Sequence, residues 1–364
     1  MTPQLPRAHG SSFFAEMHHV IMKIMCGKKK GKGITMKKHI YILATGGTIA
    51  GKAASEAATT GYEAGAIGIA DLLAAVPEVR QYADVEGEQI ASIDSKDMTS
   101  AIWLRLAARC KELLARADVD GVVITHGTDT MEETAYFLHL TVHSAKPIVL
   151  TGAMRPATAL SADGPMNLLQ AVRVATADEA VGQGVLIVLD GTIESARDAV
   201  KMHTTALGTF QSPEVGALGS VHDGEPVFYR GPLRRHTAQS TFSVEGVIEL
   251  PRVAILYAHA DDDGFLVEAA VQSGCQGIVY AGMGNGSIPA RAEAALARAA
   301  AEGVAVVRST RSAAGRVTRA EASYEANGFI ASDTLNPAKA RVLLQLTLLQ
   351  TDDTAAIRKM FKIY

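Results

Sequence analysis

The 364-residue chain has few cysteines, no long apolar run and no large excess of charge of one sign. Its three cysteines, Cys26, Cys110 and Cys275, are too few and too far apart for a disulfide framework or a zinc site. No apolar run reaches the roughly 18 residues of a membrane-spanning helix. The formal net charge of −3 creates no overall field that attracts nucleic acid or an anionic membrane. We therefore expect a globular protein with no nucleic-acid partner and no membrane partner.

The first 35 residues differ from the rest of the chain. In "FFAEMHHVIMKIMCGKKKGKG" the basic cluster follows the apolar stretch, whereas a secretory signal places its positive charge first and a cleavage site after. We interpret residues 1–35 as a disordered or spurious extension, with a degenerate targeting segment as the less favoured alternative. A cytoplasmic location is therefore expected, with a periplasmic one as the alternative.

From residue 39 onward, short β-branched runs alternate with helical stretches such as 98–117 and 289–302. The runs end in small or polar residues and lie at 121–130, 146–156, 184–192, 252–264, 277–287 and 304–310. Nearly continuous apolar strands between helices are typical of parallel sheets covered on both faces, which predicts an α/β fold.

A polar, proline-containing stretch at 228–251 interrupts this alternation. Because a domain holds about 150 residues on average, the chain length also favours about two domains. We predict a larger N-terminal α/β catalytic domain at 36–230, a linker at 231–250 and a smaller C-terminal α/β domain at 251–364.

The segment "HIYILATGGTIAGK" has two interpretations. Gly46 to Lys52 match the GxxxxGK pattern of a P-loop, but Ala53 occupies the position of the Mg²⁺-binding Ser or Thr. A Walker-B-like strand ends at Asp190, so a nucleotide hydrolase stays open as an alternative. The other interpretation is a strand that ends in a tight glycine turn and presents Thr48 to a substrate, with Lys52 as a solvated loop charge. Ligands of parallel sheets bind beyond the carboxyl ends of the strands, where Thr48 is expected.

The segment "ITHGTDTMEETAYFL" places further polar groups at a strand end. Thr130 and Glu133 form a capping box, which predicts that a helix starts there. Thr128 and Asp129 then lie beside the positive end of that helix, where they can bind a zwitterion. Together with Thr48 they indicate nucleophilic chemistry on a small polar substrate. A non-enzymatic amino-acid-binding protein is a further alternative, because the same groups could hold an amino acid without turnover.

A threonine hydroxyl needs a neighbouring base or cation to become a good nucleophile. Lys201, in "ARDAVKMHTTALGTF", and Tyr62, in "TGYEAGAIG", are candidates for this role. Burial at a strand end can lower the pKa of a lysine enough for it to act as a base. Local sequence does not connect either residue with the two threonines.

The chain resembles the bacterial-type L-asparaginase family, which includes glutaminase-asparaginases, and is most similar to its type II branch. The resemblance rests on "ILATGGTIAG", "THGTDTMEETAYFL", "GAMRP", "SADGPMNLLQA" and "TLNPAKARVLLQL", and it extends from about residue 40 to residue 364. It implies a two-domain α/β fold and the hydrolysis of the side-chain amide of L-asparagine to aspartate and ammonia. L-Glutamine is a second substrate to test, and the family needs no cofactor or metal.

The resemblance also implies catalytic roles. Thr48 matches the nucleophile that attacks the amide carbon, and Tyr62 matches a tyrosine kept close to that hydroxyl. Thr128, Asp129 and Lys201 match a second Thr-Asp-Lys group. Which threonine attacks, and which group is the base, stays open at this point.

Other matches concern substrate binding. Ser95 matches the serine that holds the substrate α-carboxylate, and Asp129 would hold the α-ammonium group with support from Asn285. Ala153 and the backbone N–H of Thr128 would line the oxyanion hole.

The same resemblance implies a homotetramer, built as a dimer of dimers, with active sites shared between subunits. Glu321, with Glu325 as the alternative, matches a glutamate that completes the network of the nucleophile from the C-terminal domain of a partner, together with Asn285. Lys96 replaces a neutral glutamine that family members often have near the substrate α-amino group. We assign Lys96 to substrate binding and expect its side chain to turn toward the α-carboxylate of the substrate.

Overall fold

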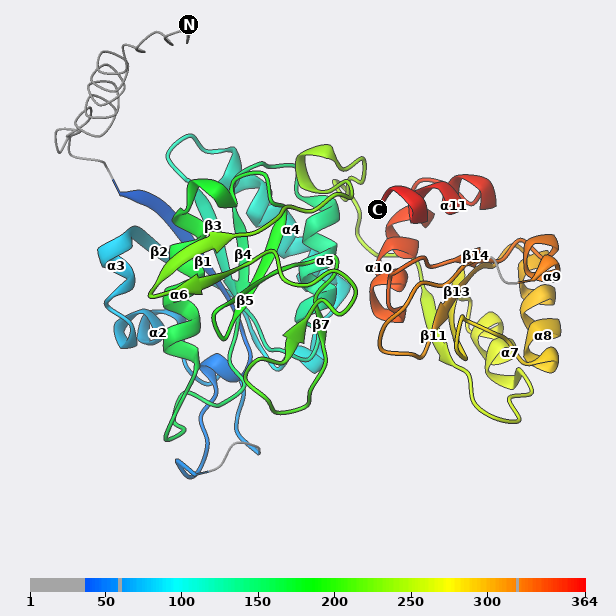
Figure 1. Ribbon diagram of the computed structural model, residues 1–364, viewed down its shortest axis with the longest axis horizontal. Helices are drawn as coiled ribbons and strands as arrows, with labels where there is room; N and C mark the ends of the chain where they lie inside the picture. Colours follow the sequence, from blue (N-terminus) through cyan, green and yellow to red (C-terminus); the bar gives the residue numbers. More distant parts are fainter. Residues whose placement is uncertain (1–36, 58–60, 319–320) are drawn as a thin grey trace, which may run out of the picture. The chain divides into compact units, whose positions relative to one another are not determined.

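The computed structural model of the protein describes residues 37–57, 61–318 and 321–364 (Figure 1). The extension predicted at 1–35 lies outside the described residues. Most of the regular structure falls into an N-terminal region, residues 38–228, and a C-terminal region, residues 253–364.

The N-terminal region is built on an eight-stranded sheet with the order β10-β9-β6-β5-β4-β3-β1-β2, as far as the described residues show. The strands are β1 (Lys38–Gly46), β2 (Ala83–Ile93), β3 (Gly121–Thr125), β4 (Ile148–Thr151), β5 (Val185–Leu189), β6 (Thr192–Ser195), β9 (Gly219–His222) and β10 (Glu225–Phe228). The strands from β2 to β5 in this order are parallel, whereas β6, β9 and β10 continue the sheet antiparallel.

Two Asp-Gly turns produce the antiparallel edge. Asp190 and Gly191 have φ angles of 48° and 73°, and they connect β5 to β6. Asp223 and Gly224 have φ angles of 47° and 79°, and they connect β9 to β10. Such left-handed pairs match the twist of a tight hairpin, and Asp-Gly tolerates this conformation well. Asp190 is therefore a hairpin residue after a buried strand.

Helices cover both faces of this sheet (Figure 1). Along β1, Ile40 and Ile42 pack with one buried cluster, whereas Tyr41 and Leu43 pack with the other, as expected from the alternation of side chains in a strand. The first face carries α2 (Ile69–Ala75), α3 (Val79–Tyr82) and α6 (Gly164–Thr176), and the second carries α4 (Ser100–Ala115) and α5 (Met131–Thr141).

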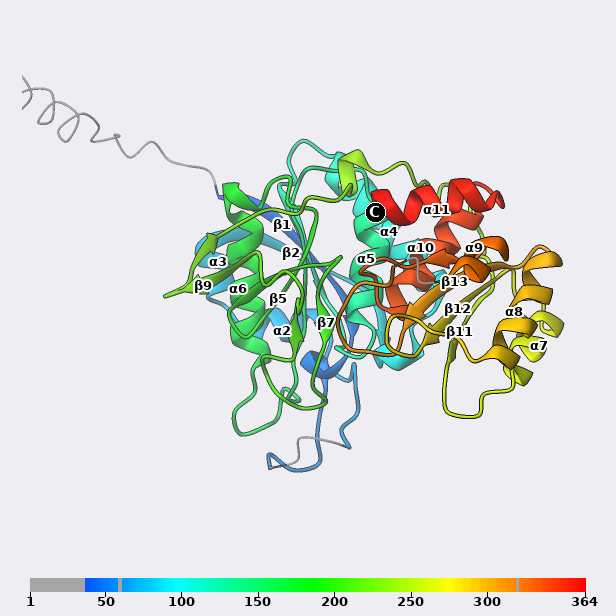
Figure 2. The same ribbon diagram turned by 45° about the vertical axis from the view of Figure 1, so that its right-hand side comes forward.

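The C-terminal region contains a four-stranded parallel sheet with the order β11-β12-β13-β14. Its strands are β11 (Val253–Tyr257), β12 (Gly277–Gly282), β13 (Ala305–Thr310) and β14 (Ile330–Ala331). Its helices are α7 (Phe265–Gln272), α8 (Ala290–Ala301), α9 (Ala322–Ala326), α10 (Pro337–Leu348) and α11 (Thr354–Ile363) (Figure 2). Helix α10 packs against α5, and one buried cluster continues from the α4 and α5 face of the large sheet into the C-terminal region.

The remaining elements are short. A separate two-stranded sheet joins β7 (Val200–Lys201) to β8 (Phe210–Gln211). Four 3-10 turns lie in the described part of the chain: η1 (Thr48–Ala50), η2 (Ser95–Asp97), η3 (Asp178–Ala180) and η4 (Thr237–Gln239).

The predicted α/β class with parallel strands is confirmed. The helical stretches predicted at 98–117 and 289–302 correspond to α4 and α8. Between the end of β10 and the start of β11, the polar stretch contains only the short turn η4. The exact domain boundaries stay a prediction. None of the described helices is both long and apolar enough to cross a bilayer.

Candidate active site

Four neighbouring parallel strands end beside one another at the candidate site. In the sheet order β2-β1-β3-β4, the chain leaves these strands toward Ser95, Thr48, Thr128 and Ala153 respectively. The carboxyl ends of parallel strands meet at one edge of a sheet, which is where α/β proteins bind ligands. The fold therefore gathers at one edge four of the residues singled out in the sequence.

Glycines allow these loops to pack backbone against backbone. Gly46 and Gly47 have φ angles of 105° and 79°. A Cβ atom on Gly47 would lie 2.3 Å from the backbone nitrogen of Gly127, and one on Gly127 would lie 2.6 Å from Ser95 Oγ. Only glycine fits such close approaches and such left-handed backbone angles. The glycine turn after β1 thus presents Thr48, while Lys52 is exposed in the loop beyond it.

Thr48 lies in contact with Tyr62. The two hydroxyl oxygens are 2.5 Å apart, and Thr48 itself is only 6% exposed. Burial raises the pKa of Tyr62 above its ordinary value of 10.0, although the hydrogen bond with Thr48 opposes this shift. The Tyr62 side chain is therefore a neutral phenol near pH 7, able to donate one proton and to accept another.

Lys201 joins Thr128 to Asp129. Its Nζ donates hydrogen bonds to Thr128 Oγ1 at 2.8 Å and to Asp129 Oδ1 at 2.6 Å. Lys201 comes from β7, far along the chain, and its side chain is only 18% exposed, whereas that of Asp129 is 59% exposed. The Lys201 side chain is thus largely buried, whereas the Asp129 carboxylate is largely exposed.

The loop after β2 is fastened to the start of α5. The backbone N–H of Asp129 donates to Ser95 Oγ at 3.2 Å, and Thr130 Oγ1 donates to the Ser95 carbonyl at 2.7 Å. Helix α5 starts after Thr130, as the capping box predicts, but the Thr130 side chain makes no capping hydrogen bond. The prediction of the capping contact was wrong, because the Ser95 carbonyl engages this hydroxyl instead.

Lys96 points to neighbouring carboxylates. Its Nζ lies 2.5 Å from Asp97 Oδ2 and 3.7 Å from Asp94 Oδ2, and its side chain is 62% exposed. These carboxylates raise its pKa, the hydrogen bond with Asp97 most of all. Two nearby anions offset the extra positive charge that Lys96 brings to this loop. Its role in substrate binding stays a prediction.

Asn285 and Glu321 belong to a different part of the molecule. Asn285 Nδ2 donates to Thr318 Oγ1 at 2.8 Å, and its Oδ1 accepts the backbone N–H of Thr318 at 2.9 Å. Glu321 precedes α9 and, with Glu325, lines a cavity of the C-terminal region. Asn285 and Glu321 are both exposed. The contacts described for Asn285 are thus with its own region, away from the Thr48 turn.

One buried acid next to the site was not singled out from the sequence. Glu132, in the first turn of α5, is 8% exposed and accepts the backbone N–H of Lys201 through Oε2 at 2.9 Å. An acidic residue at this helical position is common, because it complements the helix dipole, and this obscured its contact with Lys201. The informative signal was the helical spacing in "TMEETAYF", which places Glu132 on the same helix face as Ala135 and Tyr136.

Comparison with known families identifies the family of the chain. The model described as "Asparaginase, N-terminal" matches residues 39–234, and the one described as "Glutaminase/Asparaginase C-terminal domain" matches residues 252–361. The chain therefore belongs to the asparaginase family.

Individual relatives cover most of the chain. "L-asparaginase 2" of Bacillus subtilis is 49% identical over 327 residues, which is 90% of this chain and 86% of the relative. "Probable L-asparaginase periplasmic" of Haemophilus influenzae is 49% identical over 329 residues, 89% of this chain and 92% of the relative. A crystal structure described as "Probable Cytoplasmic L-asparaginase from Campylobacter jejuni" is 49% identical, with a TM-score of 0.88, and the match covers 90% of this chain and 100% of that one.

Proposed function

We propose that the protein is an L-asparagine amidohydrolase that forms a covalent β-aspartyl intermediate on Thr48. One observation carries this proposal: two threonine hydroxyls at neighbouring strand ends each form a hydrogen bond with a group that can transfer a proton or stabilise negative charge. Thr48 touches the Tyr62 phenol at 2.5 Å, and Thr128 touches the Lys201 ammonium at 2.8 Å. Relatives named L-asparaginase support the choice of substrate.

In the first half of the reaction, Thr48 Oγ attacks the side-chain amide carbon of asparagine. The Thr48 proton passes to the Tyr62 oxygen while Tyr62 gives its own proton to the leaving amide nitrogen, so no free phenolate is needed. This route suits a phenol whose pKa is raised by burial. Ammonia leaves, and an ester joins Thr48 to the β-carbonyl of aspartate.

In the second half, water attacks the ester carbon, and its proton returns to Thr48 as aspartate leaves. The backbone N–H groups of Thr128 and Ala153 are assigned to the oxyanion, where each donor contributes about 3 kcal/mol to transition-state stabilisation. Lys201 keeps a positive charge beside the Thr128 hydroxyl in both halves. The hydrogen bond from Lys201 Nζ stabilises negative charge that develops on the Thr128 oxygen during the reaction.

The two charged ends of the substrate are assigned to different groups. Asp129 is assigned to the α-ammonium group, because its carboxylate is largely exposed beside Thr128 and Lys201. Ser95 is assigned to the α-carboxylate from the loop after β2, with Lys96 beside it. One methylene distinguishes glutamine from asparagine and is worth about 1–3 kcal/mol, so glutamine is proposed as a slower second substrate.

The proposed active form is a homotetramer with shared sites. Asn285 and Glu321 of one subunit would complete the Thr48 site of a partner. Two facts support this: both residues are exposed, and the hydrogen bonds of Asn285 hold it to its own region rather than to the Thr48 turn.

The proposed compartment is the cytoplasm, the location in the description of the Campylobacter jejuni structure. The Haemophilus influenzae relative is instead named periplasmic. Cell fractionation with compartment markers tests this assignment, and recovery of the protein with periplasmic markers would contradict it.

Incubation of the purified protein with L-asparagine tests the function directly. Ammonia and aspartate should appear in equal amounts, and the same assay with L-glutamine should show slower release. ATP hydrolysis without ammonia release would favour the nucleotide hydrolase instead. Tight aspartate binding without turnover would favour an amino-acid-binding protein.

A further inference from the structure

The carboxylate of Glu132 bridges Lys201 to the C-terminal region of the same chain. Its Oε2 accepts the backbone N–H of Lys201 at 2.9 Å, and its Oε1 accepts a hydrogen bond from Asn336 Nδ2 at 3.0 Å. Asn336 stands immediately before α10, and its Oδ1 accepts the backbone N–H of Lys339 at 2.9 Å. Both ends of the Asn336 amide are therefore engaged, which fixes its orientation.

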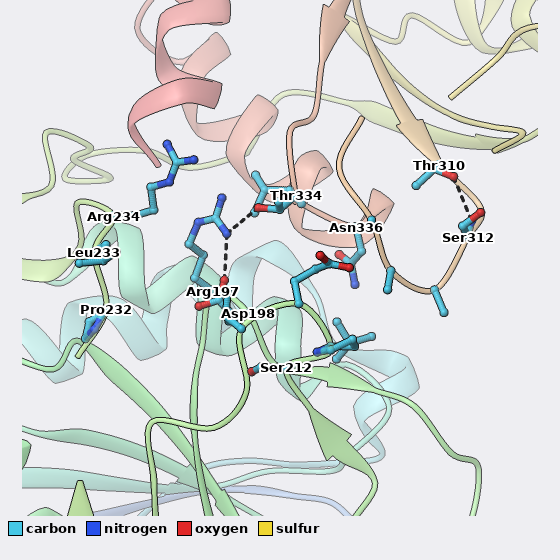
Figure 3. Close-up of a pocket in the computed structure, with 18 of the residues that line it drawn as sticks. Arg197, Asp198, Ser212, Pro232, Leu233, Arg234, Thr310, Ser312, Thr334 and Asn336 are labelled. Carbon is cyan, nitrogen blue, oxygen red and sulfur yellow. Dashed lines mark hydrogen bonds and ion pairs between the residues drawn. The ribbon is translucent and has the colours of Figure 1, made fainter. Parts of the chain in front are cut away.

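Two further contacts join the same parts of the chain. Arg197 Nη1 donates to Thr334 Oγ1 at 3.0 Å and to Asp198 Oδ1 at 2.9 Å, as the dashed lines in Figure 3 show. Lys339 Nζ donates to the carbonyl of Ala199. The segment 197–201 is thus held at three points by the segment 334–339 and by Glu132, and Figure 3 shows Arg197, Thr334 and Asn336 around one cavity.

We propose that Glu132 and Asn336 are positioning residues that set the place of Lys201 in the active site. A lysine side chain is long and flexible, so its Nζ reaches Thr128 reliably only if its backbone is fixed. Glu132 fixes the backbone N–H of Lys201, and Asn336 fixes Glu132. Neither residue needs to touch the substrate. The inference rests on the proposed function, since Lys201 matters to the reaction only through Thr128 and Asp129.

The bridge requires an acceptor-only side chain at position 132. Both contacts of Glu132 come from donors, which suits an ionised carboxylate with its two acceptor oxygens. A glutamine there offers one acceptor and one donor. In Glu132→Gln the side-chain N–H group of glutamine therefore faces another donor, either the Lys201 backbone N–H or Asn336 Nδ2. One of the two hydrogen bonds of the bridge is lost.

A second substitution should restore the bridge. In the double variant Glu132→Gln/Asn336→Asp, the side-chain carbonyl of the new glutamine accepts the Lys201 N–H, and its amide N–H donates to one oxygen of the new aspartate. The other oxygen of that aspartate still accepts the backbone N–H of Lys339. The double variant keeps one negative charge in the bridge, at position 336 instead of position 132. Asn336→Asp alone places two carboxylates 3.0 Å apart at the Oε1 contact.

The experiment measures kcat and KM for asparagine in the two single variants and in the double variant. Because a shift of about 1 Å at a catalytic group can cost roughly 100-fold, each single variant should lower kcat by about 10- to 100-fold with little change in KM. The double variant should recover most of the lost kcat. Such reciprocal recovery defines a direct coupling between the two positions.

Glu133→Gln is the matched control. Glu133 is the next residue of α5 and pairs with Arg341 of α10 at 3.8 Å, so it joins the same two helices without contacting Lys201. It should keep kcat within about twofold of wild type. Thermal unfolding of all variants distinguishes displacement of Lys201 from loss of the folded state. If Glu132→Gln does not fold, the kcat of Asn336→Asp is compared with that of Glu133→Gln instead.

The outcomes are distinct. Low kcat in the single variants with recovery in the double variant supports the inference. Single variants that behave like Glu133→Gln, or a double variant no better than the single ones, would overturn it while asparagine turnover by the wild type stands. A wild-type protein that releases no ammonia would instead overturn the proposed function and this inference with it.

Discussion

The hydroxyl oxygens of Thr48 and Tyr62 lie 2.5 Å apart, although the residues belong to different turns of the loop after β1. This contact pairs a buried threonine with a phenol that stays neutral because burial raises its pKa. A neutral phenol can accept a proton only while it releases its own. The relationship therefore favours a concerted proton relay over a phenolate base.

Thr48→Ala is expected to lower kcat for asparagine by at least about 1000-fold, because both the nucleophile and the start of the relay are lost. Thr45→Val is the matched control: the buried Thr45 hydroxyl donates to the Thr125 carbonyl at 2.9 Å and has no assigned part in the reaction. That variant should lose about 1 kcal/mol of stability but keep its kcat. Near-native kcat in Thr48→Ala would remove Thr48 from the proposed role.

Tyr62→Phe should lower kcat by about 100- to 10,000-fold, the usual contribution of a positioned proton-transfer group. The pKa of Tyr62 lies above 10.0, so ionisation of Tyr62 cannot cause an alkaline loss of rate that occurs below pH 10.0. Any alkaline limb of the wild-type pH–rate profile below pH 10.0 should therefore keep its midpoint in Tyr62→Phe. A limb that disappears with the phenol would contradict the neutral-relay role.

Lys201→Met and Thr128→Val should each reduce kcat severely, and the double variant should be little worse than either single one. The two groups share a 2.8 Å hydrogen bond, and residues that act as a unit are not additive in their effects. Lys52→Met is the control, since Lys52 is an exposed lysine of the loop that follows Thr48. Additive losses in the double variant would mean that Lys201 and Thr128 act separately.

The sequence predicted those parts of the site that depend on local signals. The glycine turn before Thr48 and the start of α5 after Thr130 follow from residues within a few positions of each other. The Thr130 side chain does not make the capping hydrogen bond that the local sequence predicts. Its hydroxyl donates instead to the carbonyl of Ser95, which is 35 residues away in the chain. Local rules cannot include a partner that only the fold brings near.

The contacts of Lys201 illustrate the same limit. Its partner Thr128 is 73 residues away, and the bridge from Glu132 to Asn336 spans 204 residues. Such contacts depend on the order of the strands and on the packing of α10 against α5. Family resemblance supplied the position of Lys201 but not the contacts that hold it. The contacts of Glu132 and Asn336 became visible only with the structure.

Acid should destabilise the protein through buried histidines, His126 among them. Burial lowers the pKa of His126 from 6.5 to about 4, and burial also lowers the pKa of His139 and of His236. Between about pH 6.5 and pH 4 the unfolded chain binds a proton at His126 that the folded chain does not. The stabilisation is therefore complete above that window and is lost as the pH falls through it.

The loss attributable to His126 between pH 7 and pH 5 is about 2 kcal/mol, from about 1.4 kcal/mol per pKa unit. His126→Gln should be less stable at pH 7, because Nδ1 donates to the Gly127 carbonyl at 2.7 Å and Nε2 contacts Thr134 Oγ1 at 2.9 Å. Its stability should nevertheless fall less on acidification, by about that 2 kcal/mol. Urea unfolding at fixed protein concentration measures this, with the exposed His143→Gln as the control. Equal pH dependence in wild type and His126→Gln would contradict the assignment.

Shared active sites can be tested by mixing inactive chains. In the proposed dimer, each site combines Thr48 of one subunit with Glu321 of its partner, and a closed symmetric pairing makes two such sites. Refolding Thr48→Ala together with Glu321→Ala gives mixed dimers in which one site has both defects and the other has none. Ammonia release should therefore return to a fraction of the wild-type rate.

The control mixture combines Thr48→Ala with Lys201→Met. Both changes lie on the same side of a shared site, since Lys201 reaches Thr128 within one chain at 2.8 Å. Every site of a mixed dimer then keeps one defect, and this mixture should stay inactive. Differently tagged chains and two-step affinity purification establish that mixed dimers form in both cases. If purified mixed dimers of Thr48→Ala and Glu321→Ala release no ammonia, each site is built within one chain, and Glu321 acts, if at all, on the site of its own subunit.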